Sequence, residues 1–310
     1  MLDVKALEIG PKPQALATRP GTWLADESSA LLSATPDPSW AEGALSVASR
    51  NRATRGVAMA RLPKALRAWL GRPVRVLGAS GTVCETRLQR FLIRAEISPD
   101  LRTAEHWEGC ADGPAIPPQA IAEEVWRLSE RSGRTLIGEF SAPCKGALFA
   151  VDPDLPTPAI AAPRPASAEG GAALMTAFRL LPAYARVQAR FHTEQPAAEG
   201  AWDDHDARSS VSTLELPGRA PLSFVSVEVG SGCSGFSASL SAVWTSDGSG
   251  WALQSIDDRR ITPSAIVDLD GSGGVVLLGP DGPFHARSVL RPPSYARTFL
   301  SSVPFLPGPC

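Results

Sequence analysis

Alternation of apolar and polar residues predicts β-strands through much of the second half of the chain. Between Phe236 and Trp244, the residues Phe, Ala, Leu, Ala and Trp alternate with three serines and Val243, a period of two that places one face of a strand in the core and the serine face in water. Short apolar runs bounded by Gly, Pro and Asp flank this strand at 211–216, 222–229, 251–256, 265–269, 275–278 and 284–290. Seven short strands with tight connections indicate an antiparallel meander, and hence a sandwich or a partly open barrel.

In the first half, the stretch from Thr82 to Ile97 predicts one long strand that contains a bulge. The expected inward positions change phase along it, from Cys84, Thr86 and Leu88 to Phe91, Ile93, Ala95 and Ile97. An inserted bulge residue produces such a change and curves a sheet toward closure. Further strands are predicted at 73–77, 135–140 and 146–151.

Three segments have helical patterns. A short helix is expected over 62–71, with Pro63 near its start and Gly71 after its end. A second is expected at 118–131, where Ile121, Val125 and Leu128 recur at helical spacing. A third is expected at 172–192, with an interruption at Pro182.

These elements, with the turn-rich stretches between them, predict a mainly β protein with a few helices and two small antiparallel β domains. Residues 1–58 are expected to be a poorly ordered N-terminal segment. Residues 59–151 form the first β-rich domain, with two short helices. The Pro/Ala-rich run at 152–171 holds five prolines among alanines and is interpreted as a linker. Residues 172–310 form a domain of a helix and an antiparallel meander.

Composition and charge narrow the class of protein. The chain has 310 residues, with 30 Lys and Arg against 32 Asp and Glu. This near-neutral balance argues against general binding of nucleic acid by bulk charge. With 44% hydrophobic and 20% charged residues, disorder throughout is excluded. No run of 18 apolar residues occurs, so no transmembrane segment is expected, and the first 20 residues lack the pattern of a secretory signal.

Five cysteines are too few for a disulfide scaffold and too widely spaced for a zinc site. Reduced, buried thiols are one interpretation. In an exported protein, Cys84 and Cys144 are the candidates for a disulfide, because neighbouring strands would bring their α-carbons to about 5.5 Å. Cys110 would then be the odd thiol, and Cys233 and Cys310 would pair only if the C-terminal tail folds back.

The segment Asp268-Leu269-Asp270-Gly271-Ser272-Gly273-Gly274 presents oxygen donors at alternate positions of a tight loop. Asp268, Asp270, Ser272 and the backbone carbonyl of Gly274 are the candidate ligands for a hard cation. The segment Asp268 to Gly273 resembles the DxDGxG loops of bacterial FG-GAP and VCBS-type β proteins, and this resemblance implies calcium. Val276 and Gly279 stand where further ligands are expected, so a site here would be weak, with dissociation constants of about 0.1 to 1 mM. An ordinary hairpin turn is the alternative.

Three other motifs give weaker indications of function. Gly230 to Gly235 matches GxGxxG, but the strand pattern that follows cannot supply the helix N-terminus that a dinucleotide requires, so no cofactor is expected there. The run Trp202-Asp203-Asp204-His205-Asp206 is interpreted as a solvated acidic loop, with a divalent metal as the alternative. The run Glu105 to Glu108 is interpreted as a surface turn anchored by Trp107.

No catalytic motif stands out, so no catalytic residue is assigned. Ser80 and Ser234 lie at turns without the strand-turn-helix setting of a nucleophile elbow. The function expected is a binding or structural module of the cell envelope or exterior, with an unknown protein or glycan as partner. Two alternatives stay open: a hydrolase with a dispersed Ser/His site between the domains, drawing on His192, His205 or His285, and an intracellular scaffold.

Overall fold

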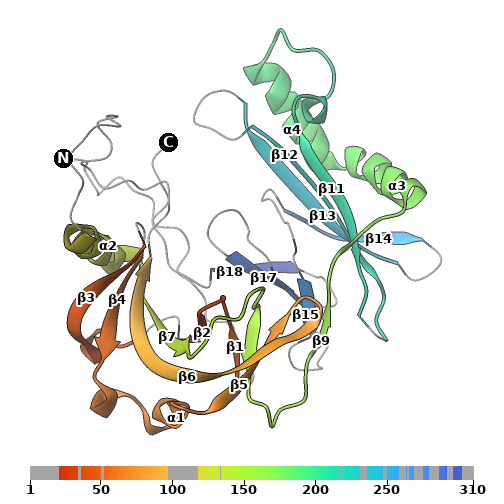
Figure 1. Ribbon diagram of the computed structural model, residues 1–310. Helices are drawn as coiled ribbons and strands as arrows, with labels where there is room; N and C mark the ends of the chain where they lie inside the picture. Colours follow the sequence, from red (N-terminus) through yellow and green to blue (C-terminus); the bar gives the residue numbers. More distant parts are fainter. Residues whose placement is uncertain are drawn as a thin grey trace. The chain divides into compact units, whose positions relative to one another are not determined.

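The computed structural model describes residues 21–33, 36–49, 52–96, 118–132, 134–216, 218–230, 236–246, 250–257, 263, 265–268, 275–278, 286–291 and 296–301. Contacts divide the chain into two compact units, and the division falls between Thr157 and Pro158, inside the run interpreted as a linker. The protein is mainly β, as the sequence predicts (Figure 1). No helix in the described residues is both long and apolar enough to cross a membrane.

The first unit is a nearly closed antiparallel barrel of eight strands. Strand β6 links its two parts, because its first half pairs with β5 and its second half pairs with β7 and β4. From β5 the sheet continues through β8 to β1. In the other direction it continues from β7 to β2. A bridge between Ala25 and Ala30 joins β2 to the end of β1 and nearly closes the barrel. The strands are β1 (Thr22–Leu24), β2 (Ser29–Ser33), β3 (Ala41–Ser49), β4 (Arg52–Val57), β5 (Pro73–Gly78), β6 (Gly81–Glu96), β7 (Thr135–Phe140) and β8 (Phe149–Val151).

The core of this unit lies between the barrel and helix α2 (Pro118–Ser132), which packs against β3, β4 and β6 (Figure 1). The apolar positions of α2 at Ala122, Val125 and Trp126 are buried there, with Phe91 and Ile93 of β6. Between β4 and β5 the chain forms two short helices, η3 (Met59–Arg61) and α1 (Lys64–Arg67). Another short helix, η2 (Pro38–Trp40), precedes β3.

The N-terminal part of this unit differs from the expectation of a poorly ordered segment over 1–58. Residues from Thr22 to Val57 supply β1 to β4, half of the barrel's strands. Their alternation is weak because Ala, Ser and Thr occupy many of the strand positions. They are strands because their partners, β6, β7 and β8, come from much later in the chain, so tertiary pairing overrides weak local preference.

The second unit has two antiparallel sheets. One runs in the order β10 (Arg164–Pro165), β11 (Arg208–Leu214), β12 (Leu222–Val229), β13 (Ala238–Ser246), β14 (Trp251–Asp257). The other runs in the order β18 (Ala296–Ser301), β17 (Ala286–Arg291), β16 (Val275–Leu278), β15 (Ala265–Asp268), β9 (Ala159–Ala161). Strands β9 and β10 lie within the run interpreted as a linker, and each sits at the edge of a sheet, where one-sided pairing tolerates proline.

Helices α3 (Ala168–Arg179) and α4 (Pro182–Glu194) cover one face of the β10–β14 sheet (Figure 1). The interruption expected at Pro182 is confirmed, since this proline is the first residue of α4. The expectation that the serine face of β13 is exposed to solvent is wrong, because Ser241 and Val243 on that face are each only 1% exposed. Val243 packs with Phe224 and with Ile266 of β15, so the second sheet covers the face that the serines suggested was open to water.

Candidate functional site

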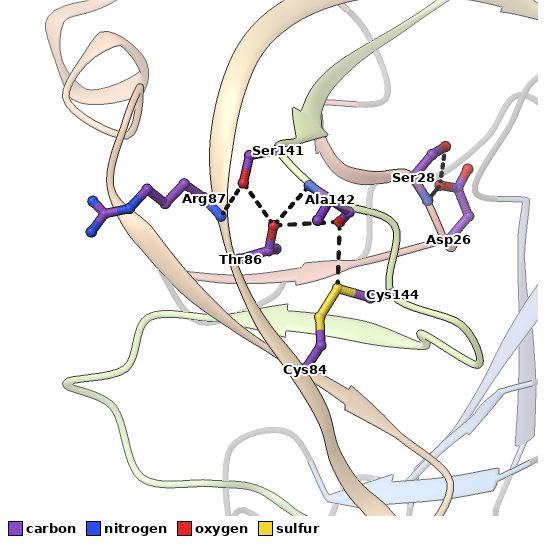
Figure 2. The surroundings of a disulfide bond; sticks show 8 residues. All are labelled: Asp26, Ser28, Cys84, Thr86, Arg87, Ser141, Ala142 and Cys144. Carbon is purple, nitrogen blue, oxygen red and sulfur yellow. Dashed lines mark hydrogen bonds between the residues drawn. A yellow bond between two sulfur atoms is a disulfide. The ribbon is translucent and has the colours of Figure 1, made fainter.

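Strand β6 carries a disulfide in its first half. Cys84 is bonded to Cys144, which lies in the loop between β7 and β8, with the two α-carbons 5.8 Å apart. Figure 2 shows the bond beside a small polar cluster in which Thr86 Oγ1 is 3.1 Å from Ser141 Oγ, and Ser141 Oγ accepts from the backbone N–H of Arg87. The predicted pairing of these two cysteines is present. Cys110, Cys233 and Cys310 lie outside the described residues.

Further along β6, the predicted bulge is confirmed at Gln89. The register with β7 shifts between Leu88 and Arg90, so that Gln89 has no partner across the ladder. Leu88 before the bulge and Phe91, Ile93 and Ala95 after it are all buried. The bulge thus keeps both halves of the strand packed on the core and turns Gln89 and Arg90 outward, where both are exposed.

Beside this bulge is a groove with a volume of about 460 Å³, within the range of small ligand sites. Strands β3, β4 and β6 supply most of its lining, and Met59 and Leu70 of the β4–β5 connection supply the rest. Its lining residues are Glu42, Gly43, Ala44, Ser46, Thr54, Arg55, Gly56, Val57, Met59, Leu70, Gln89, Arg90, Phe91 and Leu92.

Close backbone approach sets the shape of the groove at Gly56. A β-carbon at this position would lie 3.0 Å from the carbonyl oxygen of Glu42, so only glycine lets β3 come this near to β4. The β3 strand is itself irregular here, with a register shift between Glu42 and Leu45 and a positive φ of 80° at Gly43. The groove therefore lies where the edge of the barrel is bulged.

The two arginines of the groove are held in place by other groups. Arg55 Nε donates to the carbonyl oxygen of Gly43 at 2.7 Å, and its guanidinium lies 5.7 Å from the ring centre of Trp126. Arg90 forms a two-point ion pair with Glu139, with Nη2 3.0 Å from Oε1. Glu42 is exposed, and its carboxylate forms no ion pair with a described residue. The groove thus offers one carboxylate, two hydroxyls at Ser46 and Thr54, and the amide of Gln89.

The same face of the sheet continues from the groove into a group of four charges, of which Arg94 and Glu96 are buried and Asp26 and Arg52 are half-buried. Thr54 in the groove is paired across the ladder with Arg94. Arg94 is 8% exposed and ion-paired with Asp26, and it neighbours Glu96, which is ion-paired with Arg52. Burial by itself raises the pKa of Asp26, but the charge of Arg94 and hydrogen bonds from Arg94, Ser29 and Ser28 outweigh it and hold that pKa well below its ordinary value. Each charge has an opposite partner, so the arrangement suits a structural role.

Of the four candidate calcium ligands, only Asp268 lies in the described residues; Asp270, Ser272 and Gly274 do not. Asp268 ends β15, is 8% exposed, and forms an ion pair with Arg219. Over the described part of the chain, no three His, Cys, Asp or Glu side chains are grouped so as to hold a metal.

The acidic run after α4 is solvated only in its second part, where Asp204, His205 and Asp206 are exposed. Trp202 to Asp204 form a short helix, η5, and Trp202 is fully buried against Tyr184. The Asp203 side chain is 2% exposed; it lies 2.9 Å from Arg179 Nη2 and accepts a hydrogen bond from Tyr184. Burial, followed by this hydrogen bond, raises the pKa of Tyr184. The ion pair with Arg179 and the hydrogen bond from Tyr184 hold η5 against α3 and α4, so Asp203 has a structural role.

The described histidines do not form a hydrolytic pair with a serine. His192 Nε2 is 2.7 Å from Gln188 Nε2, and His205 Nε2 is 2.8 Å from the carbonyl oxygen of Glu199. Both rings pack on Phe191. Ser80 is an exposed turn residue, while Ser234, His285 and the run from Glu105 to Glu108 lie outside the described residues.

The sequence patterns do not single out the groove residues, but one signal does point to them. Ten of the chain's 30 Lys and Arg lie between Arg52 and Arg94, where Glu85 is the single acid. The near-neutral total hides this asymmetry, which a count along the chain would have found. Comparison of the chain with protein-family models, curated proteins and solved structures gives no match.

Proposed function

We propose that the protein is a binding module that works outside the cytosol, with the groove over β3, β4 and β6 as its ligand site. The main support for the proposal is that β6 is fixed by a covalent bond and shaped by a bulge. A disulfide fixes the first half of this strand, and a bulge in the second half turns Gln89 and Arg90 into the groove. A binding site gains affinity when its groups are held in place before the ligand arrives.

The groove has the chemistry of a recognition site. Its polar groups come from different strands, namely Glu42 and Ser46 of β3, Thr54 of β4 and Gln89 of β6. The lining also contains apolar side chains, among them Val57 and Leu92, and this mixture is the usual composition of a site that orients a small ligand or a short length of a polymer. The described lining contains no histidine or cysteine, and neither Ser46 nor Thr54 is hydrogen-bonded to a base.

The disulfide supports a location outside the cytosol. Disulfides persist in oxidising compartments and are rare where thioredoxin and glutathione keep thiols reduced. Cys144 is 2% exposed, Cys84 is half-buried, and the bond between them closes a loop of 60 residues, so the bond braces the barrel.

The test fills the groove without touching the core. Ser46 is exposed and forms no described hydrogen bond, so Ser46→Trp should leave the fold intact while occupying the groove. Thr82→Trp is the matched control, since Thr82 is an exposed strand residue of the same unit outside the groove. The oxidised wild type and both variants would be applied to arrays of defined glycans and peptides. We expect to find ligands that bind the wild type and the control variant but do not bind Ser46→Trp. If every ligand bound Ser46→Trp as well as it binds the wild type, or if no ligand bound the wild type, the proposal would be overturned.

A further inference from the structure

The segments that adjoin the groove's lining residues Met59, Leu70 and Gln89 carry a group of cations that the groove's own polar residues do not neutralise. Three exposed side chains make up this group, here termed the cationic wall: Lys64, Arg67 and Arg87. Lys64 and Arg67 belong to α1, which lies in the sequence between the lining residues Met59 and Leu70, and the backbone N–H of Leu70 donates to the carbonyl oxygen of Arg67 at 3.1 Å. Arg87 precedes the bulge on β6, and its Nη1 donates to the carbonyl oxygen of Gly71 at 3.0 Å, which joins β6 to the end of the α1 segment.

No carboxylate in the described residues lies within ion-pairing distance of the cationic wall. Three other arginines of this part of the chain have carboxylate partners: Arg72 with Asp152 and Asp154, Arg90 with Glu139, and Arg94 with Asp26. Arg55, Arg61 and Arg75 instead donate to carbonyl or hydroxyl oxygens. The wall therefore presents three positive charges to solvent. Exposed charges of one sign beside a groove raise the local concentration of ligands of the opposite sign.

The rest of the groove limits which anionic ligand fits. Single-stranded nucleic acid is bound on exposed aromatic side chains, but the one aromatic residue of the lining is Phe91, and it is 4% exposed. An extended peptide would need a regular sheet edge to pair with. Strand β3 ends the barrel sheet and its register is broken at two places, between Glu42 and Leu45 and between Val47 and Ser49, which suits it poorly for strand addition.

We propose that the occupant of the groove is an acidic polysaccharide, with its anionic groups on the cationic wall and its hydroxyls on Glu42, Ser46, Thr54 and Gln89. This assignment rests on the proposed function of the groove and names its ligand class. It also accounts for Glu42, because an ionised carboxylate accepts hydrogen bonds from hydroxyl groups and gives no attraction to a bare polyanion.

The experiment compares binding of dextran sulfate and alginate with binding of uncharged dextran, using the oxidised full chain at several salt concentrations. The test variant is Lys64→Glu with Arg67→Glu, whose side chains make no described hydrogen bond. The matched control is Arg186→Glu with Arg208→Glu, two exposed cations of the second unit, which changes the net charge by the same amount. We expect the test variant to lose at least tenfold in affinity and the control less than twofold. The slope of log affinity against log salt should also become shallower by about two in the test variant, one for each cation removed.

Three outcomes would overturn the ligand class: no binding of either acidic polysaccharide, equal losses in the two variants, or tighter binding of an oligothymidylate or of vesicles rich in anionic lipid. The proposed function would survive these outcomes if a neutral glycan or a peptide on the arrays still depended on Ser46. If Ser46→Trp left all binding unchanged while the cationic wall controlled it, the wall would be the site and the groove would not.

Discussion

The carboxylate of Asp26 lies 2.6 Å from Nη1 of Arg94, although the two residues are 68 positions apart in the sequence. The pair begins a row of four alternating charges: Arg94 Nε is 3.8 Å from Glu96 Oε2, and Glu96 Oε1 is 3.0 Å from Arg52 Nε. Removing one member of a buried pair leaves its partner uncompensated, which costs more than the pair itself contributes. The turn between β1 and β2 is therefore tied electrostatically to β6.

We expect this tie to make the barrel sensitive to acid. The pKa of Asp26 is lower in the folded chain than the ordinary value of 3.8, so its stabilising contribution is complete above about pH 5 and is lost as the pH falls through and below the unfolded value. Asp26→Asn should be less stable than the wild type at neutral pH, and the difference should shrink toward pH 3. Urea unfolding at pH 7, 5 and 3 measures this difference.

Glu27→Gln is the control for Asp26→Asn, because Glu27 is the exposed neighbour in the same turn. It should leave both the stability and its pH dependence close to those of the wild type. If the difference between wild type and Asp26→Asn were the same at all three pH values, the ion pair with Arg94 would not be the source of the effect.

The disulfide should contribute more to stability than any single polar contact. Cys84 and Cys144 close a loop of 60 residues, and in the chain-entropy model this stabilises the folded state by about 4 kcal/mol. Replacing both cysteines by serine should lower the unfolding free energy of the first unit by a comparable amount. A reductant should lower the stability of the wild type by a similar amount and leave that of the double variant unchanged.

Peptide mapping of unreduced protein from an oxidising compartment should give a fragment that links the two positions. Free thiols at both positions would contradict the bond and the extracytosolic location.

In the second unit, two adjacent aspartates should differ sharply in importance. Both are ion-paired with Arg179, but the Asp203 side chain is 2% exposed and that of Asp204 is 55% exposed. We expect Asp203→Ala to cost about 2 kcal/mol, because Tyr184 loses a buried acceptor while Arg179 stays partly solvated. Asp204→Ala should cost at most about 0.5 kcal/mol. Chemical denaturation of each variant, followed by far-UV circular dichroism, distinguishes them, and equal losses would mean that burial of Asp203 does not decide its role.

The sequence predicts those elements that depend mainly on interactions between residues close together in the chain. The phase change around Gln89 indicates the bulge, and Pro182 marks the start of α4. Long-range pairing decides the rest. The strands at 22–57 carry small side chains with weak alternation, so their sequence does not predict them. The serines of β13 indicate a solvent-exposed face, but the second sheet covers that face. The groove was missed for the same reason, since Glu42, Thr54 and Gln89 come together only when β3, β4 and β6 pair.

Asp268 stands between two competing partners, a neighbouring arginine and a calcium ion. Its carboxylate forms an ion pair with Arg219, while the loop that it begins predicts a calcium site. A cation that binds only the folded state at ten times its dissociation constant adds about 1.4 kcal/mol of stability, so about 10 mM calcium should raise the melting temperature by a few degrees if the dissociation constant is about 1 mM. Because Arg219 competes for the same carboxylate, Arg219→Gln should enlarge the calcium-induced rise, and Asp270→Asn should abolish it. Magnesium at the same concentration is the control, since it demands a smaller and more rigid octahedral site. Melting curves of Arg219→Gln that do not change with calcium would leave Asp268 as the buried partner of Arg219 and the loop as a hairpin turn.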